Sequence, residues 1–94
     1  MVRREATIGS RVGLHARPAA IFVQASAAAG VPVKVGKPDG KLVDARSMLG
    51  VLALGAKNGD TVVLEAEGDG AEAALDSLVE LLQQDHDEPA AADA

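Results

Sequence analysis

A single aromatic residue, Phe22, is available to fill the interior of this chain of 94 residues. Tyr, Trp and Cys do not occur in the sequence, so neither further large rings nor disulfides can stabilise the domain. The hydrophobic residues, 48% of the total, are therefore mostly Ala, Val, Leu and Ile. Side chains of this size fill an interior only when helices and strands approach one another closely. The sequence thus predicts one small domain of closely packed elements.

Charge and hydropathy exclude several kinds of partner. The formal net charge is −5, whereas proteins that bind nucleic acid usually carry a basic stripe. The longest nearly apolar run, 48–56, contains two glycines and is far too short to span a membrane. The arginines near the N-terminus are not followed by an apolar stretch of signal-peptide length. We expect a cytoplasmic monomer that binds no nucleic acid, metal or cofactor and does not insert into membranes.

Glycines, prolines and hydrophobic periodicity divide the chain into alternating segments. They predict strands over 2–8, 31–35, 41–44 and 61–67, and helices over 16–29, over a short segment between Ser47 and Gly55, and over 71–84. This β-α-β-β-α-β-α order and the right-handed crossover rule predict an α+β open-faced sandwich, with three helices on one face of a four-stranded sheet. The domain is expected over 1–84, and the acidic, Ala-rich segment 85–94 is expected to be a disordered tail.

Two segments depart from ideal patterns. Arg4 interrupts the inward-facing alternation of the first strand, which predicts that the first part of this strand lies at an edge of the sheet or is frayed. The short second helix carries Met48, Leu49 and Leu52, and so crowded an apolar set cannot all be buried by one short helix. We therefore expect part of this set to be exposed.

The segment Gly13-Leu14-His15-Ala16-Arg17-Pro18-Ala19 places a histidine at the start of the first helix. Pro18 has a backbone φ suited to a first helical turn and lacks the N–H that would be unpaired there. The helix N-terminus formed by Ala16, Arg17 and Pro18 attracts anions, and the Arg17 guanidinium suits phosphate oxygens. An imidazole titrates near pH 6.5, so a neutral fraction of His15 is available as a phosphoryl acceptor at neutral pH. A cap exposed to solvent is the simpler interpretation of such a histidine.

The full segment 13–19 resembles the active-site segment of the histidine-containing phosphocarrier (HPr) family of the bacterial phosphoenolpyruvate:sugar phosphotransferase system. The resemblance extends over about residues 2–84 and implies an antiparallel sheet of strand order 1-4-2-3. It implies that His15 accepts a phosphoryl group on Nδ1 from phospho-Enzyme I and passes it to enzyme II A components, for coupled sugar uptake and phosphorylation. Arg17 matches the arginine that clamps the phosphoryl group. Such a protein is a carrier, the substrate of phosphotransferases, and not an enzyme.

The segment 46–55 resembles the part of the family in which a dedicated kinase, HPr kinase/phosphorylase, phosphorylates a serine in some relatives. Ser47 matches that serine, although a role as a helix cap alone would explain it. Met48, Leu49 and Leu52 match the residues that dock onto Enzyme I and the enzyme II A components. Gln24 departs from the lysine that many members use to meet acidic partners.

Other classes of small α+β protein fit less well. The signature loop of acylphosphatases, the paired cysteines of metal chaperones and the exposed aromatics of RNA-recognition modules do not occur in the sequence. The alternative that stays open is an HPr-type paralogue in a nitrogen-related or a fructose- or dihydroxyacetone-specific phosphorelay. It would differ in its partners and not in its chemistry.

Overall fold

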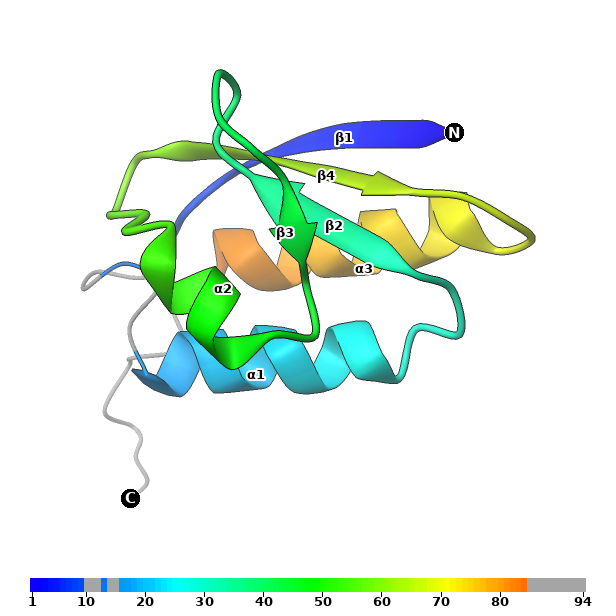
Figure 1. Cartoon of the computed structure of the whole chain (residues 1–94), viewed down its shortest axis with the longest axis horizontal. Helices are drawn as coiled ribbons and strands as arrows, with labels where there is room; N and C mark the ends of the chain where they lie inside the picture. Colours follow the sequence, from blue (N-terminus) through cyan, green and yellow to red (C-terminus); the bar gives the residue numbers. More distant parts are fainter. Residues whose placement is uncertain (10–12, 14–15, 85–94) are drawn as a thin grey trace.

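The computed structural model describes residues 1–9, 13 and 16–84 of the chain. Within these residues the elements follow the predicted order (Figure 1). They are β1 (Val2–Thr7), α1 (Ala16–Ala27), β2 (Val33–Gly36), β3 (Val43–Asp44), α2 (Met48–Ala53), β4 (Thr61–Ala66) and α3 (Ala71–Gln83). The predicted tail, 85–94, lies outside the described residues. No helix in the described part of the chain is long and apolar enough to cross a membrane.

The four strands form one antiparallel sheet in the order β1-β4-β2-β3. β4 is central: it pairs with β1 from Val2 opposite Ala66 to Thr7 opposite Thr61, and with β2 on its other side. The three helices lie on the same face of this sheet (Figure 1). The predicted open-faced sandwich and its strand order are both confirmed.

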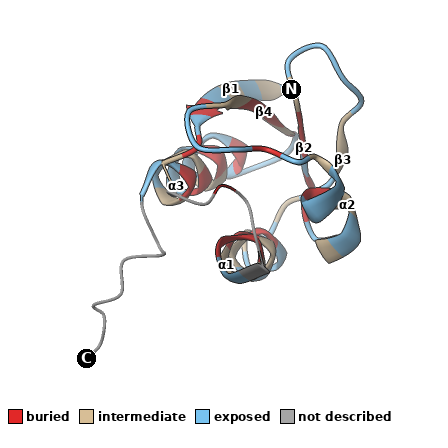
Figure 2. Ribbon diagram, turned by 90° about the vertical axis from the view of Figure 1, so that its left-hand side faces the viewer, coloured by how far each residue is buried: buried red, intermediate tan, exposed pale blue. Residues whose placement is uncertain are grey.

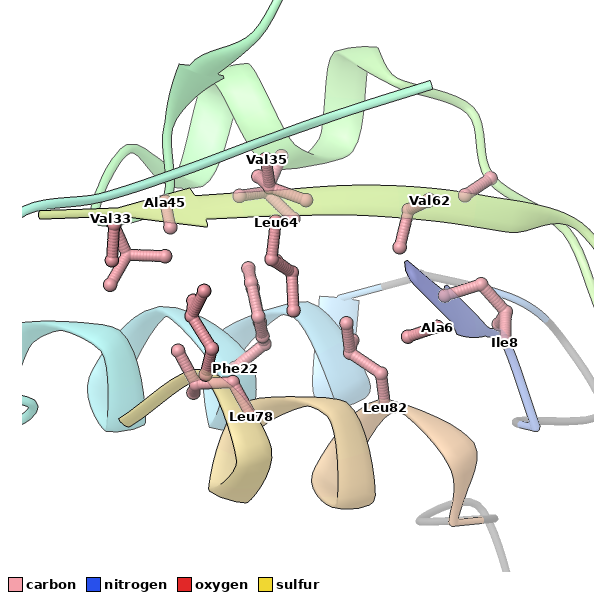
Figure 3. Close-up of a cluster of buried hydrophobic side chains, with 14 of the residues drawn as sticks. Ala6, Ile8, Phe22, Val33, Val35, Ala45, Val62, Leu64, Leu78 and Leu82 are labelled. Atoms are coloured by element: carbon pink, nitrogen blue, oxygen red, sulfur yellow. The ribbon is translucent and has the colours of Figure 1, made fainter. Parts of the chain in front are cut away.

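The core lies between the sheet and the helices, where the buried surfaces of both layers face one another (Figure 2). Phe22 in α1 has no exposed surface, and neither has Leu64 in β4. Leu64 points from the sheet toward Phe22 and toward Leu78, which belongs to α3 (Figure 3). The single aromatic residue thus lies where the helical layer and the sheet meet, in a core whose other members are aliphatic residues, including small ones such as Ala19 and Ala71.

The first strand lies at the edge of the sheet, as Arg4 predicts. Arg4 faces the helical layer, and its Nε lies 3.1 Å from Asp76 Oδ1 of α3. An edge position allows this charged head to reach solvent while the aliphatic stem covers apolar surface. The residue that interrupts the alternation is therefore accommodated by an ion pair at the rim of the core.

All four strands are shorter than predicted, β1 and β4 by one residue at their ends, and β2 and β3 also begin later. β2 begins at Val33 and not at Val31, because Pro32 has no N–H for the ladder. β3 is reduced to Val43–Asp44. A methyl group on Gly36 would lie 2.5 Å from the Lys41 carbonyl oxygen, so the chain returning toward β3 lies directly against the end of β2.

The face of the sheet that carries no helices is not fully open. Val63 belongs to this face, because its neighbours Val62 and Leu64 both point into the core. Val63 nevertheless has no exposed surface. It pairs with Gly36, where the absence of a side chain allows Leu42 to approach closely. The predicted solvent-facing side therefore carries a small apolar contact of its own.

Candidate functional site

The structure describes Gly13 and the residues from Ala16 onward in the predicted phosphoryl-acceptor segment. His15, the predicted acceptor, lies outside the described residues, as does Leu14. α1 begins at Ala16, directly after His15 in the sequence. The prediction that a helix starts immediately behind the histidine is confirmed.

The first turn of α1 combines an exposed cation with buried anchors. Arg17 is exposed, whereas Pro18 and Ala19 are buried. The first backbone N–H groups of a helix have no partner within that helix, and Pro18 has no such group to leave unpaired. No acidic residue occurs in this first turn. The end of α1 thus carries positive charge from both the backbone dipole and the Arg17 guanidinium.

The chain before this turn is fastened to two other segments. The N–H of Ile8 donates to the carbonyl of Asp60, and the N–H of Gly59 donates back to the carbonyl of Ile8, both at 2.9 Å. The N–H of Gly9 donates to the carbonyl of Leu82 at 2.9 Å. These bonds fix the end of β1 against the loop before β4 and against the end of α3.

Ser47 caps α2, as the sequence predicts. Its backbone is extended, and its Oγ accepts a hydrogen bond from the N–H of Gly50 at 3.1 Å. Asp44 receives hydrogen bonds from the side chain and backbone of Arg46 just before this cap, and these bonds hold the pKa of the Asp44 carboxyl below its ordinary value of 3.8. The neighbourhood of Ser47 therefore contains a carboxylate and a guanidinium that already bind one another.

The apolar residues of α2 divide between core and surface. Val51 has no exposed surface and belongs to the core. Leu49 is 82% exposed and Leu52 is 37% exposed, while Met48 is partly buried against the core. The prediction that this crowded helix exposes part of its apolar set is confirmed. We call Met48, Leu49 and Leu52 the α2 patch.

α2 packs against α1 (Figure 1). The α2 patch and the first turn of α1 therefore belong to neighbouring helices of one layer. Within residues 1–9, 13 and 16–84, no group of three or more His, Cys, Asp or Glu side chains could hold a metal ion.

One contact near the predicted acceptor, that of Gly13, is not indicated by the sequence. Gly13 lies against the backbone of Ala56 and Lys57, a contact between residues more than forty positions apart in the sequence. Gly13 has a positive φ of 78°, a backbone conformation that glycine adopts readily. Nothing in the sequence pattern indicates which distant backbone it approaches.

The strand order and the single helical layer place this chain in the class of open-faced α+β sandwiches. A family model described as "PTS HPr component phosphorylation site" matches residues 2–84. The chain is 51% identical over 84 residues to the phosphocarrier protein HPr of Streptomyces coelicolor, with 89% of this chain and 90% of that protein covered. The chain belongs to the HPr family of phosphocarrier proteins of the phosphotransferase system.

Solved structures agree with this membership. The crystal structure of a phosphocarrier protein HPr from Bacillus anthracis superposes with a TM-score of 0.82 at 35% identity, covering 87% of this chain and 96% of that chain. Crh of Bacillus subtilis, described as a domain-swapped dimer, has a TM-score of 0.68 at 37% identity and coverage of 88% and 94%. The fold is thus shared by carriers and by a relative described as a dimer.

Proposed function

We propose that this chain accepts a phosphoryl group on His15 from phospho-Enzyme I and passes it to enzyme II A components, for coupled sugar uptake and phosphorylation. The observation that carries this proposal is the match of the phosphorylation-site model over residues 2–84. That range includes the segment Gly13–Ala19, in which His15 is the one nucleophilic side chain. The start of α1 directly behind it supports the same assignment.

The proposed transfer needs a neutral imidazole. A lone pair on the His15 ring attacks phosphorus, and the new N–P bond forms while the bond between phosphorus and Enzyme I breaks. Transfer to an enzyme II A component reverses these roles, so His15 returns to its starting state. Arg17 and the first turn of α1 (Ala16, Arg17 and Pro18) would balance the charge of the phosphoryl oxygens.

We propose that the α2 patch is where both partners dock. A carrier must bind donor and acceptor in succession and leave each quickly, which favours a small exposed apolar surface. Leu49 and Leu52 provide such a surface on the helix next to α1.

The small size of this exposed apolar surface also favours a monomer over a stable dimer, although the Crh dimer shows that a relative of this fold can dimerise. Light scattering on purified protein over a range of concentrations tests this point.

We also propose Ser47 as a site for an HPr kinase/phosphorylase. A phosphate at this position would add about two negative charges at the start of α2. Such charge suits a helix N-terminus but repels an acidic partner at the adjacent α2 patch. Incubation with that kinase and ATP, followed by mass analysis of wild type and Ser47→Ala, tests the assignment.

The decisive experiment mixes the chain with phosphoenolpyruvate and an active Enzyme I and measures intact mass. We expect one added, acid-labile phosphoryl group on wild type, none on His15→Ala, and slower addition on Arg17→Ala. Phosphorylation of His15→Ala at the wild-type rate would overturn the assignment of the acceptor. No adduct on wild type, with Enzyme I shown to be active on another carrier, would favour a dedicated phosphorelay with its own donor.

A further inference from the structure

Gly13 lies two residues before His15 and occupies a place that no side chain can share. It is buried, and its φ of 78° lies in the left-handed region. A methyl group built on it would lie 2.6 Å from the carbonyl oxygen of Ala56 and 2.9 Å from Cα of Lys57. Both neighbours are backbone atoms, so they cannot move aside as a flexible side chain would.

The backbone against which Gly13 lies is itself held firmly. Ala56 is 4% exposed and belongs to the core. The N–H of Lys57 donates to Asp60 Oδ2 at 2.9 Å, and the N–H of Asp60 donates to the carbonyl of Lys57 at 2.9 Å. The same turn is bonded to β1 through Gly59 and Ile8. Gly13 therefore lies against backbone that is held in place by the core and by hydrogen bonds to the end of the first strand.

The other side of the acceptor is also fixed. α1 begins at Ala16, and Pro18 and Ala19 are buried. Gly13 and Ala16 thus bracket Leu14 and His15 with two anchored points of backbone. Only Leu14 separates Gly13 from His15 in the sequence, and two residues extend over at most about 7 Å, so the position of Gly13 limits where His15 can lie.

We propose that Gly13 is a positioning residue for phosphoryl transfer: its direct contact with the backbone of Ala56 and Lys57 sets the point from which the chain reaches His15. This inference rests on the proposed function of His15. It predicts that any side chain at Gly13 misplaces the imidazole relative to a docked donor. A misplacement of about 1 Å at a reacting group costs about 100-fold in rate.

The chain supplies a matched control for the left-handed backbone. Gly30 has a φ of 82°, but a methyl group there would meet nothing within 4 Å. Gly30→Ala therefore carries the same backbone penalty as Gly13→Ala without the steric overlap. A difference in transfer rate between the two variants is therefore due to the contact with Ala56 and Lys57 and not to the loss of a glycine alone.

The experiment measures single-turnover transfer from phospho-Enzyme I to wild type, Gly13→Ala and Gly30→Ala, together with the NMR titration of the His15 imidazole. For Gly13→Ala we expect a fall in the transfer rate at saturation of about 100-fold, with little change in KM because the α2 patch is intact. The titration midpoint of His15 should move in this variant alone. Gly30→Ala should transfer at the wild-type rate, because its added methyl group meets nothing within 4 Å.

Equal rates and equal His15 titrations in the two alanine variants would overturn the inference. A wild type that an active Enzyme I does not phosphorylate would instead overturn the proposed function, while the His15 titrations would still report on the contact. Circular dichroism establishes whether Gly13→Ala is folded. If it is not, Asp60→Ala becomes the test, because it removes the acceptor of the Lys57 N–H without adding a side chain at Gly13. The control is Asp39→Ala, which removes an exposed carboxylate in the turn between β2 and β3. We then expect the transfer rate of Asp60→Ala to fall several-fold below that of Asp39→Ala. Equal rates in these two variants would refute the inference.

Discussion

Ser47 Oγ accepts a hydrogen bond from the N–H of Gly50 at 3.1 Å, and this bond begins a helix of six residues. The first turn of α2 contains no acidic residue and the last turn no basic residue, so side-chain charges do not reinforce its ends. A helix this short depends on its cap and on the burial of Val51. The same hydroxyl is the proposed phosphorylation site, so structural and regulatory roles meet in one atom.

Replacing Ser47 with alanine should remove this cap. We expect Ser47→Ala to lower the free energy of unfolding by about 1 kcal/mol, measured by urea denaturation. Ser77→Ala, at an exposed position within α3, is the control: it should leave stability unchanged or raise it by up to about 0.5 kcal/mol, because alanine is the better helix former. A Ser47→Ala protein as stable as wild type would show that the hydrogen bond to Gly50 contributes nothing.

Replacing Leu49 with serine should separate docking from folding. Its side chain is 82% exposed, so we expect the free energy of unfolding to change by less than about 0.5 kcal/mol. KM for transfer from phospho-Enzyme I should rise about tenfold, the effect of losing about 1.4 kcal/mol of partner contact. Ala73→Ser, on the exposed side of α3, should leave KM unchanged. A normal KM in Leu49→Ser would place the docking surface elsewhere.

Most of the fold could be predicted from the sequence, because the residues that begin and end helices, strands and turns act through their near neighbours in the chain. The capping of α2, for example, follows from Ser47. Local patterns also predicted, from Arg4, that the first part of β1 lies at an edge or is frayed, and β1 is an edge strand. Strand order did not follow from local patterns, because the position of β4 between β1 and β2 depends on contacts distant in sequence. That order was expected only from the family resemblance.

The candidate site likewise contains some features that local sequence predicts and others that depend on contacts distant in the sequence. The start of α1 directly after His15 and the exposure of part of the apolar set of α2 could be predicted, since both depend on neighbours within a turn or two. The contact of Gly13 with Ala56 could not, because a glycine without a side chain leaves no periodic signal of what it touches. The burial of Val63 on the helix-free face was not predicted either; its strand partner is Gly36, against which Leu42 lies closely.

The carboxylate of Asp60 makes the turn before β4 sensitive to acid. The hydrogen bond from the Lys57 N–H, reinforced by Lys37 at 3.7 Å, holds the pKa of this carboxyl below its ordinary value of 3.8. A carboxyl whose pKa is lowered by folding contributes stability that is complete above its unfolded pKa and is lost as the pH falls through its folded pKa. We therefore expect the stability difference between wild type and Asp60→Asn to be constant near neutral pH and to shrink below about pH 4.

Carbon-13 NMR titration of the carboxyl groups checks the sign of this effect directly. The resonance of Asp60 should titrate with a midpoint below 3.8. A midpoint at or above that value would show that the bond to Lys57 does not persist in solution.

Ser26 provides a prediction in the opposite direction, toward greater stability. It lies in α1, is 1% exposed, and its Oγ has no hydrogen-bond partner among the residues that the structure describes. A buried hydroxyl without a partner costs about 1–3 kcal/mol, and alanine is also the better helix former. We expect Ser26→Ala to raise the free energy of unfolding by about 1 kcal/mol or more, well above the gain in Ser77→Ala. A loss of stability in Ser26→Ala would instead reveal a buried water bound to the hydroxyl.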